Sequence, residues 1–145
     1  MTTLNFDSPA VQNYLTILQS VINRMANNSS SCKTWCITII SAIIVIVSDK
    51  QKPNLVWISI VPLFLFFMMD VYYLSLEKQF RSMYNCIIKK VHTNSANIED
   101  VFIVSPSYNF FETTKFIIKA LISFSVYPFY CLLALMVFIV RLWII

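Results

Sequence analysis

Two apolar segments separated only by a short polar turn constrain the fold of this chain more than any other feature. The first, TWCITIISAIIVIVS, covers residues 34–48, and the second, LVWISIVPLFLFFMMDVYYLSL, covers residues 55–76, with DKQKPN between them. A helix needs about 20 apolar residues to cross a bilayer. We therefore expect a hairpin of two transmembrane helices over residues 33–48 and 55–76. Within the second helix we expect Pro62 to cause a mild kink and Ser59 to partly satisfy the freed backbone group.

A third apolar run, residues 117–140, predicts a third transmembrane helix, with Pro128 near its middle. Lys, Arg and Trp side chains typically mark the ends of such helices, where they reach the polar surface of the bilayer. Arg141 and Trp143 directly follow this run, and Trp35 lies at the start of the first span. We expect these three residues to be interface anchors.

The composition agrees with membrane insertion. The mean hydropathy is +0.70, 58% of the 145 residues are hydrophobic and only 12% are charged, about half the usual charged share. Residues 1–145 are therefore predicted to form a single all-α integral membrane domain. Because glycine is absent, phosphate-binding loops, dinucleotide-binding fingerprints and glycine-lined selectivity filters are excluded.

Amphipathic helices are predicted on both sides of the hairpin. Apolar residues at spacings of three and four indicate a helix over residues 9–26, within a cytoplasmic arm of residues 9–32. The same pattern continues the second span into a cytoplasmic helix over residues 77–93. The two apolar stripes are Val11, Tyr14, Leu18, Val21 and Met25 on the first helix, and Leu76, Phe80, Met83, Ile87 and Val91 on the second.

Residues 94–114 are predicted to be a polar, irregular linker between the second and third spans. Within it, VFIVSP at residues 101–106 is compatible with a short extended piece. The following NFFE resembles a helix capping box, with Asn109 as the cap and Glu112 at the third helical position.

The distribution of Lys and Arg predicts the topology. Three spans place the N-terminal arm and residues 77–115 on one side of the membrane, and that side carries most of the basic residues. The other side holds only Lys50, Lys52 and Arg141. Since basic residues favour the cytoplasmic side, we expect a cytoplasmic N-terminus and a C-terminus on the opposite side.

The hairpin also predicts a register. If the arms pair antiparallel about the turn, facing residue numbers sum to about 103, which places Lys33 opposite Asp70 and Arg24 beside Glu77. Asp70 is the only acidic residue within an apolar span, and an unpaired carboxylate there costs several kcal/mol. We expect an Asp70–Lys33 contact, within one copy or between copies. The alternative is that Asp70 simply reaches the lipid headgroups.

Metal and redox chemistry have little support. Cys32 and Cys36 lie one turn apart, but a soft-metal site needs further thiolate or imidazole ligands, and His92 is the only histidine. We therefore expect the cysteines to pack, without a metal or cofactor. No clustered basic stripe indicates nucleic-acid binding, and no catalytic motif indicates an enzyme.

The order of these features resembles a known group of proteins. An amphipathic helix, an Asn/Ser segment with CKTW, a short span, a Lys-containing turn and a second span that runs into a long helix occupy residues 9–93. This arrangement resembles small bacterial membrane effectors of conflict and anti-phage systems, namely SLATT-like two-span domains and the RipA-family octameric membrane proteins. The third span is an addition to the two-span plan. The resemblance implies a homo-oligomeric inner-membrane protein. Together with the topology predicted from Lys and Arg, this gives a multi-pass protein with a cytoplasmic N-terminus and a periplasmic C-terminus.

The same resemblance implies that the protein permeabilises the membrane in antiviral defence, in response to a phage protein or another cytoplasmic trigger. Three spans with few polar groups cannot enclose a solute path, so a pore requires a ring of copies in contact with lipid. We expect Lys33, Asp70, Arg24 and Glu77 to act in assembly and gating. The alternative is a non-conducting scaffold or accessory subunit that tethers a cytoplasmic partner through residues 77–114.

Overall fold

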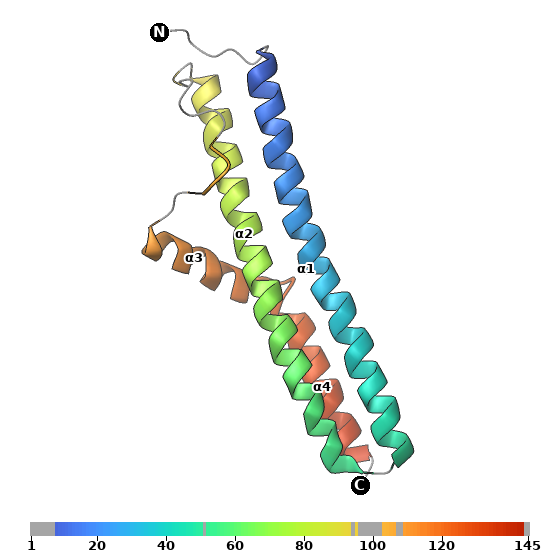
Figure 1. The fold of residues 1–145 in the computed structure, drawn as a ribbon. Helices are drawn as coiled ribbons and strands as arrows, with labels where there is room; N and C mark the ends of the chain where they lie inside the picture. The colour runs from blue at the N-terminus through green and yellow to red at the C-terminus, as the bar shows by residue number, and fades with distance from the viewer. Residues whose placement is uncertain (1–7, 51, 94, 96–102, 107–108, 144–145) are drawn as a thin grey trace.

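The structure is a computed structural model that describes residues 8–50, 52–93, 95, 103–106 and 109–143. In this part of the chain every element is helical, as predicted. The elements are α1 (Pro9–Lys50), the 3-10 helix η1 (Pro53–Ser59), α2 (Ile60–His92), α3 (Phe110–Leu121) and α4 (Tyr127–Trp143). Helix α1 and the η1–α2 arm form a long antiparallel hairpin (Figure 1). The 42 residues of α1 correspond to a length of about 63 Å.

Both arms of the hairpin are long and apolar enough to cross a membrane, by length and composition, and α4 is a shorter apolar helix. The Asn/Ser segment at residues 27–31 does not interrupt α1. Each arm therefore continues as one helix from its amphipathic half into its apolar half.

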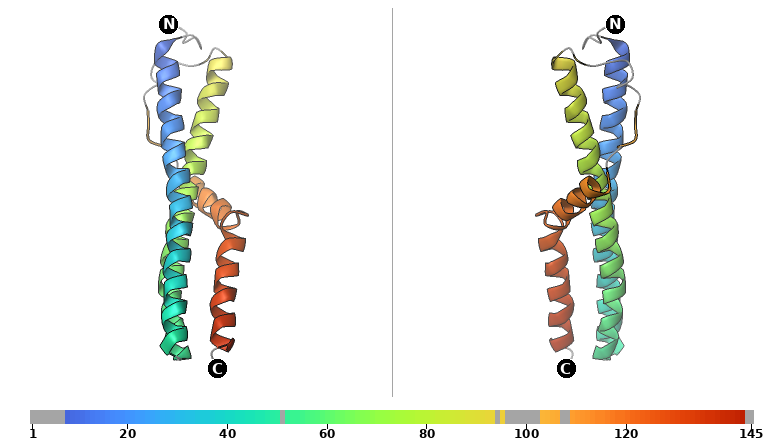
Figure 2. Two further views of the ribbon diagram at one scale, coloured as in Figure 1. Left: turned by 90° about the vertical axis from the view of Figure 1, so that its right-hand side faces the viewer. Right: turned by 90° about the vertical axis from the view of Figure 1, so that its left-hand side faces the viewer.

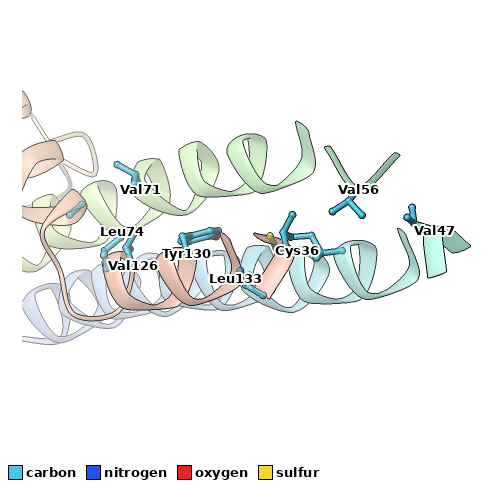
Figure 3. Close-up of a cluster of buried hydrophobic side chains, with 11 residues drawn as sticks. Cys36, Val47, Val56, Val71, Leu74, Val126, Tyr130 and Leu133 are labelled. Carbon is cyan, nitrogen blue, oxygen red and sulfur yellow. The ribbon is translucent and has the colours of Figure 1, made fainter. Parts of the chain in front are cut away.

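The buried apolar side chains of the described residues form two clusters along the hairpin. The stalk core lies between the N-terminal half of α1 and the C-terminal half of α2, and it contains most of both predicted amphipathic stripes. The turn core lies between α1, η1, α2 and α4 and includes residues from Cys36 to Val137. Figure 3 shows part of the turn core, with Cys36, Leu74 and Tyr130 from three different helices.

The second arm begins as a 3-10 helix rather than as a kinked α-helix. Pro62 lies in the first turn of α2 and lacks the N–H group that would donate to the carbonyl of Ile58 in an α-helix. The preceding 3-10 helix has i→i−3 hydrogen bonds, such as the one from the Ile60 N–H to the Trp57 carbonyl. These bonds do not require an N–H group at residue 62. Ser59 does not satisfy the backbone as expected, because its hydroxyl is buried without a hydrogen-bond partner in the described part of the chain.

The third apolar run does not form one continuous helix, so the prediction of a single helix over residues 117–140 is wrong. Helix α3 ends at Leu121, and α4 begins at Tyr127. Pro128 is the second residue of α4 instead of its midpoint. At the start of a helix the missing N–H of proline costs little, whereas in the middle it removes a hydrogen bond. The position of Pro128 therefore favours a new helix start.

Helix α3 begins within the predicted linker. Asn109 is the N-cap, as predicted, but its side chain makes no capping hydrogen bond. Its backbone carbonyl accepts hydrogen bonds from the N–H groups of Glu112 and Thr113. Before α3, residues 103–106 are described without a strand, and residues 101–102 of the predicted extended piece lie outside the described residues. The buried Tyr14 hydroxyl donates to the carbonyl of Ile103 and holds this segment against α1.

Helix α3 lies across α2, and α4 then runs beside the apolar half of the hairpin (Figures 1 and 2). Ala120, which is fully buried, is where α3 contacts the turn core. Lys78 of α2 donates from Nζ to the carbonyl of Lys119 at 2.7 Å and so caps the last turn of α3. At the far end of α4, Arg141 Nη2 donates to Asn54 Oδ1 at 3.1 Å. The end of α4 is thereby held beside the hairpin turn, opposite the N-terminus.

The close packing at Ala120 gives a test of this arrangement. We expect Ala120→Leu to lower the free energy of unfolding by about 1–3 kcal/mol, because three additional carbon atoms do not fit a filled site. The measurement is denaturant unfolding in detergent. Ile118→Leu, at a neighbouring position that is 48% exposed, should change stability by less than about 0.5 kcal/mol. Equal effects of the two changes would contradict the packing of α3 on the hairpin.

Candidate functional site

The candidate site is a polar layer of three side chains between the stalk core and the turn core. Ser29 and Lys33 are one turn apart on α1, so both point toward the same neighbour, and Asp70 faces them from α2. Met25 belongs to the stalk core on one side of this layer, and Cys36 belongs to the turn core on the other. The layer is thus the point where the two apolar cores meet.

The three side chains of the polar layer contact one another directly. Lys33 Nζ lies 2.8 Å from Asp70 Oδ2 and donates to Ser29 Oγ at 3.2 Å. Ser29 Oγ in turn donates to Asp70 Oδ1. Asp70 Oδ1 therefore accepts a hydrogen bond, whereas Oδ2 meets the Lys33 ammonium as an ion pair and has no hydrogen-bond donor in the described part of the chain. The side chain of Asp70 is fully buried, and that of Lys33 is 18% exposed.

The predicted contact between Lys33 and Asp70 is confirmed, and it is made within one copy of the chain. The Asp70 carboxylate is fully buried and faces α1. This excludes the alternative in which Asp70 would extend outward to the lipid headgroups. Burying two charges costs desolvation energy that their attraction offsets only with close contacts and additional hydrogen bonds. The hydroxyl of Ser29 supplies one of these bonds.

Two residues of this region were missed by sequence reasoning. Ser29 has a detectable signal, because it precedes Lys33 by one turn and so also faces Asp70 in the predicted register. Tyr130 of α4 has none, since no local pattern sets its partner. Its hydroxyl donates to the carbonyl of Phe66 at 3.1 Å, one turn before Asp70 on α2. Its ring meets that of Phe67 edge to face, with centroids 5.3 Å apart.

The second predicted charge contact is not formed. Glu77 pairs with Arg81 on the same helix, with Arg81 Nε 2.7 Å from Glu77 Oε1. Arg24 is exposed, and no described ion pair joins it to Glu77. The register predicts which residues of the two helices lie within one turn of each other. It does not account for a competing partner four residues away on the same helix, where opposite charges commonly pair.

The predicted cysteine pair is buried within the hairpin. Cys32 and Cys36 are both buried, whereas Cys86 and Cys131 are exposed, and none of the four forms a disulfide. Among the described residues, no group of three or more His, Cys, Asp or Glu side chains is placed to hold a metal ion. Cys36 contributes to the turn core as a small apolar side chain.

The three predicted anchors lie at the two ends of the apolar half. Trp35 is 60% exposed near the polar layer, and Trp143 is 88% exposed at the end of α4. Arg141 lies next to Trp143 and is held by its hydrogen bond to Asn54. Trp57, which is 50% exposed, adds a tryptophan near the turn that the sequence analysis did not single out.

Comparison with known proteins identified no relative of this chain. The chain matches no protein-family model, no curated protein and no solved structure. The function is therefore argued from the residues and their arrangement.

The coupling in the polar layer can be measured. Asp70→Asn and Lys33→Met should each lower the free energy of unfolding by about 3–5 kcal/mol, because each leaves a buried charge without its partner. The double change Lys33→Met with Asp70→Leu should recover most of that loss, since apolar side chains can replace a buried ion pair at little net cost. The measurement is unfolding in detergent of these variants and of Asp70→Leu alone. Lys33→Met, Asp70→Leu and their combination then form a double-mutant cycle.

The Glu77–Arg81 pair on α2 provides the control. Arg81→Gln breaks this i,i+4 pair, in which the arginine is 60% exposed and the glutamate 12% exposed, and it should cost less than about 1 kcal/mol. If Asp70→Asn had as small an effect as Arg81→Gln, the buried pair would not hold the two helices together.

Proposed function

We propose that this protein is a membrane-embedded homo-oligomer of the bacterial inner membrane, which forms or gates a pore in antiviral defence. The observation that carries the proposal is the buried Lys33–Asp70 pair at the junction between the amphipathic and apolar halves of two continuous helices. A signal received by the amphipathic half would reach the apolar half through these helices. The ion pair holds one arrangement of the junction.

The dimensions of the apolar half support its placement in a bilayer. From Lys33 to Lys50, α1 has 17 residue steps, or about 26 Å, close to the roughly 30 Å of a hydrocarbon core. Exposed tryptophans lie near both ends, Trp35 at one and Trp143 at the other, as in the aromatic belts of membrane proteins. The membrane would then begin near the polar layer, with the stalk core in the cytoplasm.

The proposed pore lies between copies, not within one. Between the polar layer and the turn, Ser59 is the one buried polar residue in the described part of the hairpin. A single copy therefore offers too few polar groups to line a path for water. Several large apolar side chains are exposed along α1, η1, α2 and α4, where lipid or another copy can cover them. Examples are Val45, Ile46, Val61, Phe64, Leu132 and Phe138.

The antiviral role and its cytoplasmic trigger, such as a phage protein, are supported by the resemblance of the arrangement over residues 9–93 to small anti-phage membrane effectors.

Arg24 is exposed on the stalk and is available to another copy or to a trigger. In the closed state Lys33 and Asp70 remain paired. Glu77, whose partner Arg81 is largely exposed, would sense contacts that reach this side of α2.

Two measurements on the full chain test the proposal. In detergent, the complex should have a mass corresponding to more than two copies of the 16.9 kDa chain. In reconstituted vesicles, Asp70→Asn should increase dye leakage over the wild type, because it removes the charge that holds the junction closed. Lys89→Gln, which removes an exposed charge farther along α2, should leave leakage unchanged.

A monomeric or dimeric complex would contradict the pore, because so few copies cannot surround a water path. If a larger complex formed but neither the wild type under phage challenge nor Asp70→Asn in vesicles caused leakage, the non-conducting scaffold would be the correct function. The partner would then be sought at residues 77–114.

A further inference from the structure

A pocket of about 580 Å³ lies at the elbow between α3 and α4. Its walls come from three elements, which are α2, the end of α3 with the residues that follow, and the first half of α4. They are almost entirely apolar. The pocket is lined by Phe67, Leu121, Ile122, Tyr127, Tyr130, Cys131 and Ala134. Such a site suits a hydrocarbon chain better than a polar ligand.

Two lysines lie close to this pocket. Lys78 donates from Nζ to the carbonyl of Lys119 at 2.7 Å, and the Lys119 backbone lies two positions before the pocket residue Leu121. The Lys78 ammonium is therefore held about one helical turn from the pocket wall. The Lys119 ammonium itself lies 6.0 Å from the centre of the Phe116 ring, toward the start of α3. Burial lowers the pKa of Lys78; the Glu77 carboxylate opposes this shift, and the charge of Lys119 adds to it. The two ammonium groups are thus close enough to repel each other.

The end of α3 does not oppose an anion at this position. A helix C-terminus is negative when its last carbonyls are unpaired. Here the carbonyls of Ile118, Lys119 and Ala120 all accept hydrogen bonds, from Lys78 and from backbone N–H groups that follow them. The Glu77 carboxylate beside Lys78 is paired with Arg81, so Lys78 and Lys119 leave a net positive charge at the end of α3.

Helix α3 has the form of a helix that lies in the plane of a membrane surface. It crosses the hairpin where the apolar half begins, as Figures 1 and 2 show. Exposed Ile117 and Ile118 lie on one side of α3, while exposed Glu112, Lys115 and Lys119 lie on another. Amphipathic helices of this kind lie at the boundary between headgroups and acyl chains. The elbow pocket would then open at headgroup depth.

We propose that the elbow pocket binds one acyl chain of an anionic phospholipid, whose phosphate is held by Lys78 and Lys119. This inference rests on the membrane placement within the proposed function, and it does not depend on a pore. The apolar walls supply affinity for the chain, and the two lysines select a negatively charged headgroup over a zwitterionic one. The bound lipid would fix the angle between α3 and α4.

Quenching of a single tryptophan by brominated lipids tests this directly. Trp35, Trp57 and Trp143 are changed to Phe, and Tyr127→Trp places the reporter at the pocket. The protein is reconstituted in phosphatidylcholine vesicles that contain a small fraction of either brominated phosphatidylglycerol or brominated phosphatidylcholine. Brominated phosphatidylglycerol should quench the reporter more strongly at the same mole fraction.

Lys119→Gln should reduce this preference about fivefold, as expected for one basic residue at a membrane surface. This change leaves the Lys119 backbone carbonyl available to Lys78, so α3 keeps its cap. The matched control is Lys115→Gln, which removes the same charge one turn earlier on α3 and should retain the preference. Equal quenching by the two lipids, or equal losses in the two variants, would overturn the site.

A second reporter separates this inference from the proposed function. A variant that retains only Trp143, which is 88% exposed at the opposite end of α4, should be quenched by both lipids if the protein is embedded. Quenching at Trp143 but not at the pocket would show that protein fills the pocket, such as a second copy, and would overturn the lipid site. Absence of quenching at both reporters would overturn the membrane placement as well.

Discussion

The arrangement of the chain depends on one buried ion pair. Lys33 and Asp70 meet between two apolar cores, and Ser29 donates a hydrogen bond to one oxygen of the carboxylate. An apolar hairpin alone would tolerate sliding of one helix along the other, because apolar contacts are not directional. A charged pair in an apolar surrounding permits only the register in which the charges meet. The short turn sets the approximate register of the two arms, and the ion pair favours the one alignment in which Lys33 and Asp70 meet.

This register gives the two halves of the molecule different roles. On one side of the polar layer, the stalk core joins two amphipathic helices whose outer surfaces carry charges such as Arg24. On the other side, the turn core joins helices whose outer surfaces are apolar. Helix α3 crosses the hairpin close to this boundary, and Lys78 connects it to α2. The pocket residue Phe67, Asp70 of the polar layer and Lys78 at the cap of α3 thus lie within about 17 Å along α2.

The sequence was sufficient to predict the features set by periodicity and by unique charges. The hairpin, both amphipathic stripes and the Lys33–Asp70 contact follow from apolar spacing and from a single acidic residue within an apolar run. The break between α3 and α4 was not predicted, because hydropathy averages over residues 117–140 and does not register that Pro128 favours a helix start. The contacts of Tyr130 depend on how α4 packs, and the pairing of Glu77 depends on competition between two arginines. Neither is encoded in a local pattern.

The most direct test of the central claim is a cysteine accessibility scan along α1 in membranes. Single cysteines at exposed positions from Asn23 to Ile46 are introduced with Cys86 and Cys131 changed to Ser, and they are labelled with a water-soluble maleimide. The account predicts fast labelling before the polar layer and protection beyond it, with the change within about one turn of Lys33. Uniform labelling along the whole helix would contradict a membrane boundary at the buried ion pair.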